Sequence, residues 1–225
     1  LTQFAQTQSV LVIVNTKAWA QQLYQACRSQ DVDADALFHL STNQCPAHRK
    51  ALLDGDPTTD RLGIRQRLAA QQPVLCISTQ LIEAGVDISA AVVIRFLAGL
   101  DSIAQAAGRC NRHGERSGKG QVLVVNPAPE NLDKLPDIKI GREVAARIFG
   151  EIKSGALNCS PLSPQAMNRY FNYYFFQRKN EMLYHVKQED GADNILNLLT
   201  KNSKKTVIPR IAPQLPLLTQ SFIQA

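Results

Sequence analysis

Short runs of apolar residues, separated by longer amphipathic stretches, are the feature that most limits what this chain can fold into. The first run, Val10–Val14, contains no polar residue, which is typical of a strand buried on both faces of a sheet. Further candidate strands lie at Leu37–Leu40, Val74–Thr79, Val92–Leu97 and Val122–Asn126. Because amphipathic stretches separate these runs, we expect right-handed helical crossovers and one parallel sheet.

The intervening stretches have the periodicity of helices that cover such a sheet. We expect these helices at Lys17–Arg28 and near Ala47–Leu53, Arg61–Ala70 and Ser102–Asn111. In parallel sheets, ligand-binding residues collect at the carboxyl ends of the strands. Polar residues lie at three of these ends, namely Asn15-Thr16, Ser78-Thr79-Gln80 and the stretch that enters Asp101.

The character of the sequence changes after Gly150. A loop-like stretch, an aromatic cluster at Tyr170–Phe176 and a proline-rich end follow. We therefore expect a lobe over residues 1–150 and, over 151–225, a linker with the start of a mostly helical accessory region. Aromatics at almost every position of Tyr170–Phe176 would cover all faces of a helix. This favours a buried helix over a one-sided platform for stacking bases.

The composition excludes some classes of protein. No run approaches the ~18 consecutive apolar residues of a membrane span, and the 44% hydrophobic content is ordinary for a globular chain. The five cysteines are never at metal-ligand spacing, which predicts reduced thiols in a cytoplasmic protein. The chain begins at Leu1 without a signal-peptide pattern, so we expect a fragment. The net charge of +6 is only weak support for a polyanionic partner.

The segment with the most chemical meaning runs from Gln105 to Arg112. On a helix, Gln105, Arg109 and Arg112 would share one face. Two guanidiniums on one face repel unless an anion lies between them, and their planar fork suits phosphate oxygens. Gly108 would cost the helix about 1 kcal/mol relative to Ala, which favours close approach to a neighbour or ligand. Taken alone, a solvated basic face explains the segment equally well.

A second segment, Ser78–Ile88, leaves a buried strand and bends sharply near Gly85. The hydroxyls and amides of Ser78 and Thr79 can bind phosphate. The Asp87 carboxylate can accept a hydrogen bond from a ribose hydroxyl or from an arginine of the Gln105–Arg112 segment. Taken alone, a capped turn is the simpler interpretation.

Together the two segments resemble motifs V and VI of superfamily 2 helicases, and especially of the helicase–nuclease of type I CRISPR interference. The matching stretches are ISTQLIEAGVDIS (Ile77–Ser89) and DSIAQAAGRCNRHGE (Asp101–Glu115). In addition, LVIVNT (Leu11–Thr16) is similar to motif IV, and HLSTNQCPAHR (His39–Arg49) is similar to another stretch of this family.

The resemblance is strong over residues 10–126 and thin over 127–215. PLLTQSFIQA (Pro216–Ala225) is similar to the beginning of the family's accessory domain. The resemblance implies the second RecA-like lobe of a motor that moves along single-stranded DNA. It also implies ATP hydrolysis between two lobes and a nuclease elsewhere in the protein.

The resemblance further implies roles for the matched residues. Arg109 and Arg112 would be arginine fingers reaching the γ-phosphate of ATP, and Gln105 would contact the same phosphate or orient water. Such fingers are worth about 10³–10⁵ in the rate of phosphoryl transfer. The commonest helicase form has Arg directly after the Gln, whereas this chain has Ala106.

Two further groups of residues are implied to bind ligands. The nucleotide would lie near Gly85, Asp87 and Gly108. The phosphates of the tracked strand would be held by Asn15, Thr16, Ser78 and Thr79.

Several parts of a complete motor are missing from the sequence. The Gly114–Gly120 stretch differs from a Walker A loop in glycine spacing, in lacking the Mg²⁺-binding Ser/Thr and in following a helix, so we interpret it as a turn. No acidic Walker B box follows an apolar strand, and no His-Asp pair is present. ATP and Mg²⁺ would therefore be bound mainly by a first lobe, and the nuclease metal would not be in this chain. We expect the isolated chain to hydrolyse no ATP.

The implied partners are single-stranded DNA, the first RecA-like lobe and nuclease domain of the same protein, and a crRNA-guided surveillance complex, with no membrane. Alternatives are a lobe of another superfamily 2 DNA or RNA helicase and a non-catalytic nucleic-acid-binding scaffold. An unrelated doubly wound nucleotide-binding enzyme is disfavoured, because Val14 leads into Asn15-Thr16-Lys17 and not into a Gly-rich loop.

Overall fold

The structure is a computed structural model that describes residues 8–30, 32–83, 86–112, 114 and 120–181, and only the backbone of residues 185–188 and 191–194. By compactness the chain forms two units, Leu1–Tyr170 and Phe171–Ala225. The described part of the second unit includes an antiparallel pair, β6 (His185–Gln188) and β7 (Gly191–Asn194). Pro216–Ala225 lies outside the described residues.

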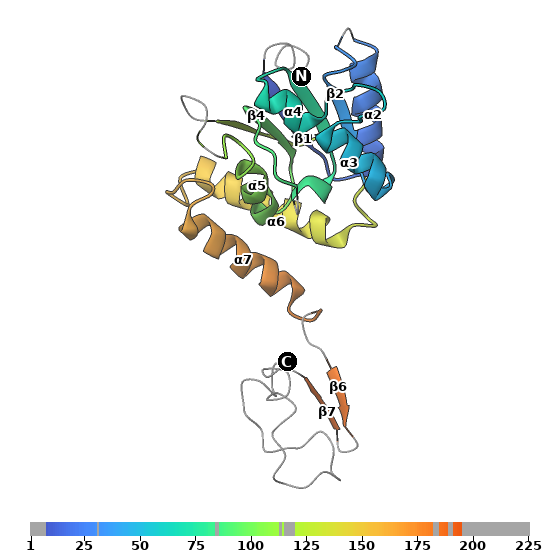
Figure 1. Ribbon diagram of the computed structural model, residues 1–225. Helices are drawn as coiled ribbons and strands as arrows, with labels where there is room; N and C mark the ends of the chain where they lie inside the picture. The colour runs from blue at the N-terminus through green and yellow to red at the C-terminus, as the bar shows by residue number, and fades with distance from the viewer. Residues whose placement is uncertain are drawn as a thin grey trace, which may run out of the picture. The chain divides into compact units, whose positions relative to one another are not determined.

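A five-stranded parallel sheet forms the centre of the first unit (Figure 1). Its strands are ordered β2-β3-β1-β4-β5. Their bounds are β1 (Ser9–Ile13), β2 (Leu37–Leu40), β3 (Val74–Ser78), β4 (Val92–Phe96) and β5 (Gln121–Val125). Each predicted strand agrees with these bounds to within one residue. The predicted fold class, a parallel sheet flanked by helices, is confirmed.

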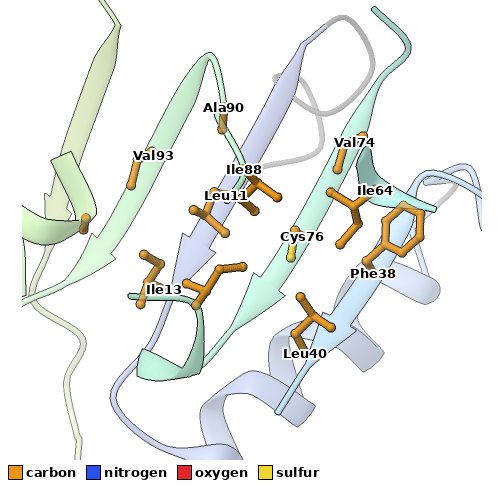
Figure 2. Close-up of a cluster of buried hydrophobic side chains, with 12 residues drawn as sticks. Leu11, Ile13, Phe38, Leu40, Ile64, Val74, Cys76, Ile88, Ala90 and Val93 are labelled. Carbon is orange, nitrogen blue, oxygen red and sulfur yellow. The ribbon is translucent and has the colours of Figure 1, made fainter. Parts of the chain in front are cut away.

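Alternating side chains of the strands fill two hydrophobic clusters. Val10 and Val12 of β1 pack in one cluster, together with Trp19 of α2 (Lys17–Arg28). Leu11 belongs to the second cluster, which Figure 2 shows along one face of the sheet. Because β1 is buried on both faces, residues 10–13 of this strand are all apolar. Each fully buried aliphatic side chain of this size stabilises the fold by about 1.5–3 kcal/mol.

The remaining helical elements of the first unit are α3 (Pro46–Asp54), α4 (Ile64–Ala69), the 3₁₀ helix η1 (Gln80–Glu83), α5 (Leu100–Ala107), α6 (Pro136–Lys153) and the first half of α7 (Pro164–Arg178). Helix α2 matches its predicted bounds, whereas α4 is shorter than predicted and α6 was not predicted. Within the described residues, no helix has the length and apolar character that a membrane span needs.

The helix predicted near Ser102–Asn111 ends earlier than expected. Helix α5 stops at Ala107, and Gly108 caps its C-terminus. The chain then pairs with the residue ahead of β4, because the Ala90 N–H donates to the Arg109 carbonyl and the Asn111 N–H donates to the Ala90 carbonyl. This bridge cannot form while residues 108–111 remain helical.

The aromatic cluster lies on α7, as a helix was expected there, but it is not buried throughout. Tyr170 is 2% exposed. Its hydroxyl donates to Asp101 Oδ1 over 3.0 Å. By contrast, Phe175 and Phe176 are 45% and 71% exposed. The predicted all-round burial is therefore wrong for these two residues.

Candidate nucleotide and nucleic-acid site

The carboxyl edge of the sheet contains a topological switch point. The chain leaves β1 toward β2 and leaves β4 toward β5, so the switch point lies between β1 and β4. Open parallel sheets bind ligands at such points. Asn15 and Thr16 follow β1 at this edge, and Ser78 ends β3.

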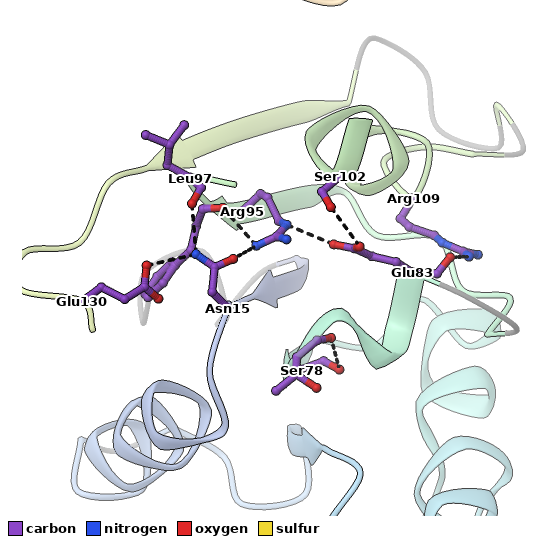
Figure 3. A network of polar contacts seen from close by, with 10 residues as sticks. Asn15, Ser78, Glu83, Arg95, Leu97, Ser102, Arg109 and Glu130 are labelled. Carbon is purple, nitrogen blue, oxygen red and sulfur yellow. Dashed lines mark hydrogen bonds and ion pairs between the residues drawn. The ribbon is translucent and has the colours of Figure 1, made fainter. Parts of the chain in front are cut away.

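A buried polar network fills the switch point (Figure 3). At its centre is Arg95 of β4, whose side chain has no exposed surface. Its Nε lies 3.0 Å from Glu83 Oε1 at the end of η1. Its Nη1 donates to Asn15 Oδ1 over 2.6 Å. Arg95 therefore joins β4 both to Asn15, shortly after β1, and to Glu83 in the segment after β3.

The network continues from Asn15 and from Glu83. Asn15 Nδ2 donates to the Leu97 carbonyl and to Glu130 Oε2, each over 3.0 Å. On the other side, Ser102 Oγ donates to Glu83 Oε2 over 3.5 Å. Asn15 is 5% exposed, and its carboxamide forms its hydrogen bonds with other residues of the lobe.

Burial dominates the electrostatics of the central pair. Burial raises the pKa of the Glu83 carboxyl. The positive charge of Arg95 lowers this pKa, whereas the negative charge of Asp101 raises it further. Burial lowers the pKa of the Arg95 guanidinium, against the attraction of Glu83. Burial therefore disfavours the charged form of both partners.

Arg109 is attached to the segment after β3 and is 9% exposed. Its Nη2 donates to the Glu83 carbonyl over 2.8 Å, and its Nη1 donates to the Val86 carbonyl. Burial lowers the pKa of its guanidinium, and the nearby charge of Arg112 lowers it further. The same Glu83 thus contacts Arg109 through its backbone and Arg95 through its side chain.

Arg112 lies in a more open environment. Its Nη1 is 2.8 Å from Asp87 Oδ1, and the two side chains are 42% and 64% exposed. Its backbone N–H donates to Ser89 Oγ over 2.9 Å. The sequence left two partners open for Asp87, a ribose hydroxyl or an arginine. In the structure Asp87 pairs with an arginine, Arg112.

Gln105, Arg109 and Arg112 do not share one helical face, contrary to the sequence prediction. Gln105 lies exposed on α5, whereas both arginines lie beyond its end. Gly108 is the exposed C-cap residue. Ala106, which replaces the common Arg, is fully buried in the second cluster.

The predicted phosphate-binding residues differ in exposure. Thr16 is partly exposed and caps α2, its Oγ1 accepting from the Trp19 N–H over 3.2 Å. Thr79 is also partly exposed, whereas Ser78 is fully buried. Gly85 lies outside the described residues.

The sequence analysis missed Arg95, Glu83 and Glu130. Arg95 carried a usable signal, since it is the single charged residue in the apolar strand Val92–Phe96. Glu83 lay within the quoted motif without a role. Among the described residues, no group of three or more His, Cys, Asp or Glu could hold a metal ion.

Residues 6–115 match the family described as CRISPR-associated nuclease/helicase Cas3, C-terminal. The matched residues make up just under half of the chain. The matched stretch includes β1 to β4, α5 and both arginines, so it contains every residue of the candidate site except Glu130.

A curated Cas3 protein and solved Cas3 structures are also similar to this chain. The CRISPR-associated nuclease/helicase Cas3 of Haloferax volcanii is 56% identical over 64 residues, which are 26% of this chain and 7% of that protein. The crystal structure of T. fusca Cas3 is similar with a TM-score of 0.55 and 18% identity, covering 80% of this chain and 22% of that one.

A structure of a CRISPR RNA-guided surveillance complex, pre-nicking, is also similar, with a TM-score of 0.53 and 17% identity, over 79% of this chain and 24% of that one. At these identities the structural likenesses show the fold alone. This chain spans less than a quarter of the length of each of these relatives.

Proposed function

We propose that this chain is the second RecA-like lobe of an ATP-dependent motor that moves along single-stranded DNA and works with a nuclease in CRISPR defence. The observation that carries the proposal is the contact of Arg109 and Arg112 with the Glu83–Asp87 segment, inside the stretch that matches the Cas3 C-terminal family. The crystal structure of T. fusca Cas3-ATP also has a fold similar to that of this chain.

The two arginines have different roles in this proposal. Exposed ion pairs contribute only about 0–1 kcal/mol, so Arg112 can exchange Asp87 for a phosphate oxygen at little cost. Arg109 would have to leave two backbone carbonyls in a buried position. We therefore assign Arg112 as the principal finger. Arg109 supports it and adds positive potential at the same phosphate, and Gln105 orients water from the exposed surface of α5.

The nucleic-acid contacts are divided by exposure. Thr16 and Thr79 are the partly exposed polar residues of the predicted set, so they would contact phosphates of the tracked strand. Asn15 and Ser78 are buried and would instead fix the ends of β1 and β3. Asp87 and Gly108 would lie near the nucleotide, and the same role stays a prediction for Gly85.

The remaining parts of the cycle lie outside this chain in the proposal. The β-phosphate and Mg²⁺ would be bound by the first lobe, and the nuclease would use its own metal. Because a surveillance complex is among the similar structures, we propose that the parent protein acts with a crRNA-guided complex of this kind. A cytoplasmic location fits these partners.

The test measures ATP turnover by the full-length parent protein with and without single-stranded DNA. We expect Arg112→Ala to lower DNA-stimulated turnover by about 10³-fold, because it removes charge stabilisation of phosphoryl transfer. Arg109→Ala should also lower it. The matched control is Arg147→Ala, which removes an exposed arginine paired with Glu151 along α6. Wild-type turnover in both finger variants would contradict the proposal.

The choice of polynucleotide separates the proposal from its alternatives. Stimulation by single-stranded RNA and not by DNA would identify another superfamily 2 helicase. A parent protein that binds DNA without turning over ATP would be a scaffold.

A further inference from the structure

We propose that the buried pair of Arg95 and Glu83 is a positioning device that holds Arg109 in place and links it to the end of β1. This inference rests on the proposed function, because Arg109 is taken to act at the ATP site. Neither residue of the pair would touch the nucleotide.

The first support is the double use of Glu83. Its carboxylate lies 3.0 Å from Arg95 Nε, and its carbonyl accepts from Arg109 Nη2 over 2.8 Å. The Glu83 side chain is 7% exposed and is held between Arg95 and Ser102, so it has little freedom to move apart from its own backbone. A change in the position of the carboxylate therefore changes the position of the carbonyl that holds Arg109.

The second support is the reach of Arg95 across the sheet. From β4 its Nη1 donates to Asn15 Oδ1, directly after β1. Asn15 in turn contacts Leu97 and Glu130, the latter located after β5 (Figure 3). The predicted strand-binding edge and the arginine segment are thus joined by an unbroken series of hydrogen bonds and an ion pair.

The third support comes from the energetics of burial. Removing two charges from water is costly, and apolar residues of similar volume are often as stable in such positions. Arg95 lies in an otherwise apolar strand where an aliphatic residue would pack. Stability alone therefore does not account for the pair, whereas a requirement for geometry does.

The test uses the full-length parent protein and replaces the pair by apolar residues, Arg95→Met with Glu83→Leu. We expect the double variant to stay folded, with a kcat for DNA-stimulated ATP hydrolysis lowered by about 10²-fold, as for a misplaced reacting group. The KM for ATP should change far less. The matched control is Arg67→Met, because Arg67 is likewise a buried arginine, 9% exposed, but it contacts the Pro73 carbonyl and Asp33 at the amino end of the sheet.

A double-mutant cycle with Arg109→Ala distinguishes positioning from a structural role. If the pair acts through Arg109, its replacement should lower kcat little further in the Arg109→Ala background. An undiminished loss in that background would overturn the proposal, as would wild-type kcat in the folded double variant. If the double variant does not fold, Arg95→Lys takes its place in the same cycle and is judged by the same outcomes.

Failure of this inference is separable from failure of the proposed function. Wild-type turnover in Arg109→Ala would refute a catalytic role of Arg109 itself, and with it the inference. Impaired turnover in Arg109→Ala, with an unaffected pair variant, would refute the positioning device alone.

Discussion

Arg109 donates to two backbone carbonyls from a buried position, whereas Arg112 pairs with Asp87 in the open. The two residues are three positions apart in sequence. Because both are arginines of the same motif, the sequence predicted the same role for both. What separates them is the fold of the Glu83–Asp87 segment, which covers one guanidinium and leaves the other accessible. At this scale, function depends on how easily each cation can leave its present partners.

This difference predicts unequal losses of stability. Arg109→Ala leaves the partly buried carbonyls of Glu83 and Val86 without their donor and should lower the free energy of unfolding by about 1–3 kcal/mol. Arg112→Ala removes an exposed pair and should lower it by about 0–1 kcal/mol. Urea unfolding of the chain followed by circular dichroism measures both. Equal losses would show that Arg109 is not held as the hydrogen bonds indicate.

Residue identities predicted only part of the candidate site. The motif pointed to Arg109, Arg112 and Asp87, because charged residues at fixed spacing are visible in the sequence. The role of Glu83 was not visible, since its partner Arg95 is on another strand and meets it only after folding. Asn15 was correctly located at the edge of the sheet, but its burial depends on the same distant partners.

Elements were predictable where their burial follows from local pattern. Strands buried on both faces must be apolar throughout, so β1, β3 and β4 were recognisable. The end of α5 was not, because it is determined by the bridge between Ala90 and Cys110. Helix α6 had a readable stripe at Gly141, Val144, Ala145 and Ile148, which are its buried residues, but two glycines weakened the helical signal.

These two glycines of α6 provide a matched pair of substitutions. A Cβ at Gly141 would lie 3.0 Å from the Cα of Gly99, whereas a Cβ at Gly150 would have no atom within 4 Å. Gly150→Ala should therefore raise the free energy of unfolding by about 0.5–1 kcal/mol through helix propensity. Gly141→Ala should lower it by about 1–2 kcal/mol, because overpacking exceeds that gain.

Thermal unfolding of the two α6 variants beside the wild-type chain measures the difference. Opposite shifts of Tm are expected. A raised Tm for Gly141→Ala would show that α6 does not approach Gly99 closely.

At the scale of the whole molecule, alternation of strands and helices was enough to predict the parallel sheet, because its connections have few alternatives. The described residues contain no metal-binding cluster, and the catalytic arginines of the proposal face a nucleotide held by another lobe. In this proposal the first unit contributes one half of an enzyme site, and the other lobe contributes the rest.

The isolated chain should therefore show no ATP hydrolysis above background, with or without single-stranded DNA. The measurement is phosphate release at protein concentrations at which the full-length parent protein is active. DNA-dependent turnover by the chain alone would mean that it binds the β-phosphate and metal itself.

The shared use of Glu83 also has an evolutionary consequence. Loss of either charge of the Arg95–Glu83 pair leaves the other buried and uncompensated, so single substitutions at these positions pass through a strongly destabilised intermediate. Lineages should keep both residues or replace both together. Positions 83 and 95 would then covary, whereas Arg112 would be kept by its role at the nucleotide and not by its exposed pair with Asp87.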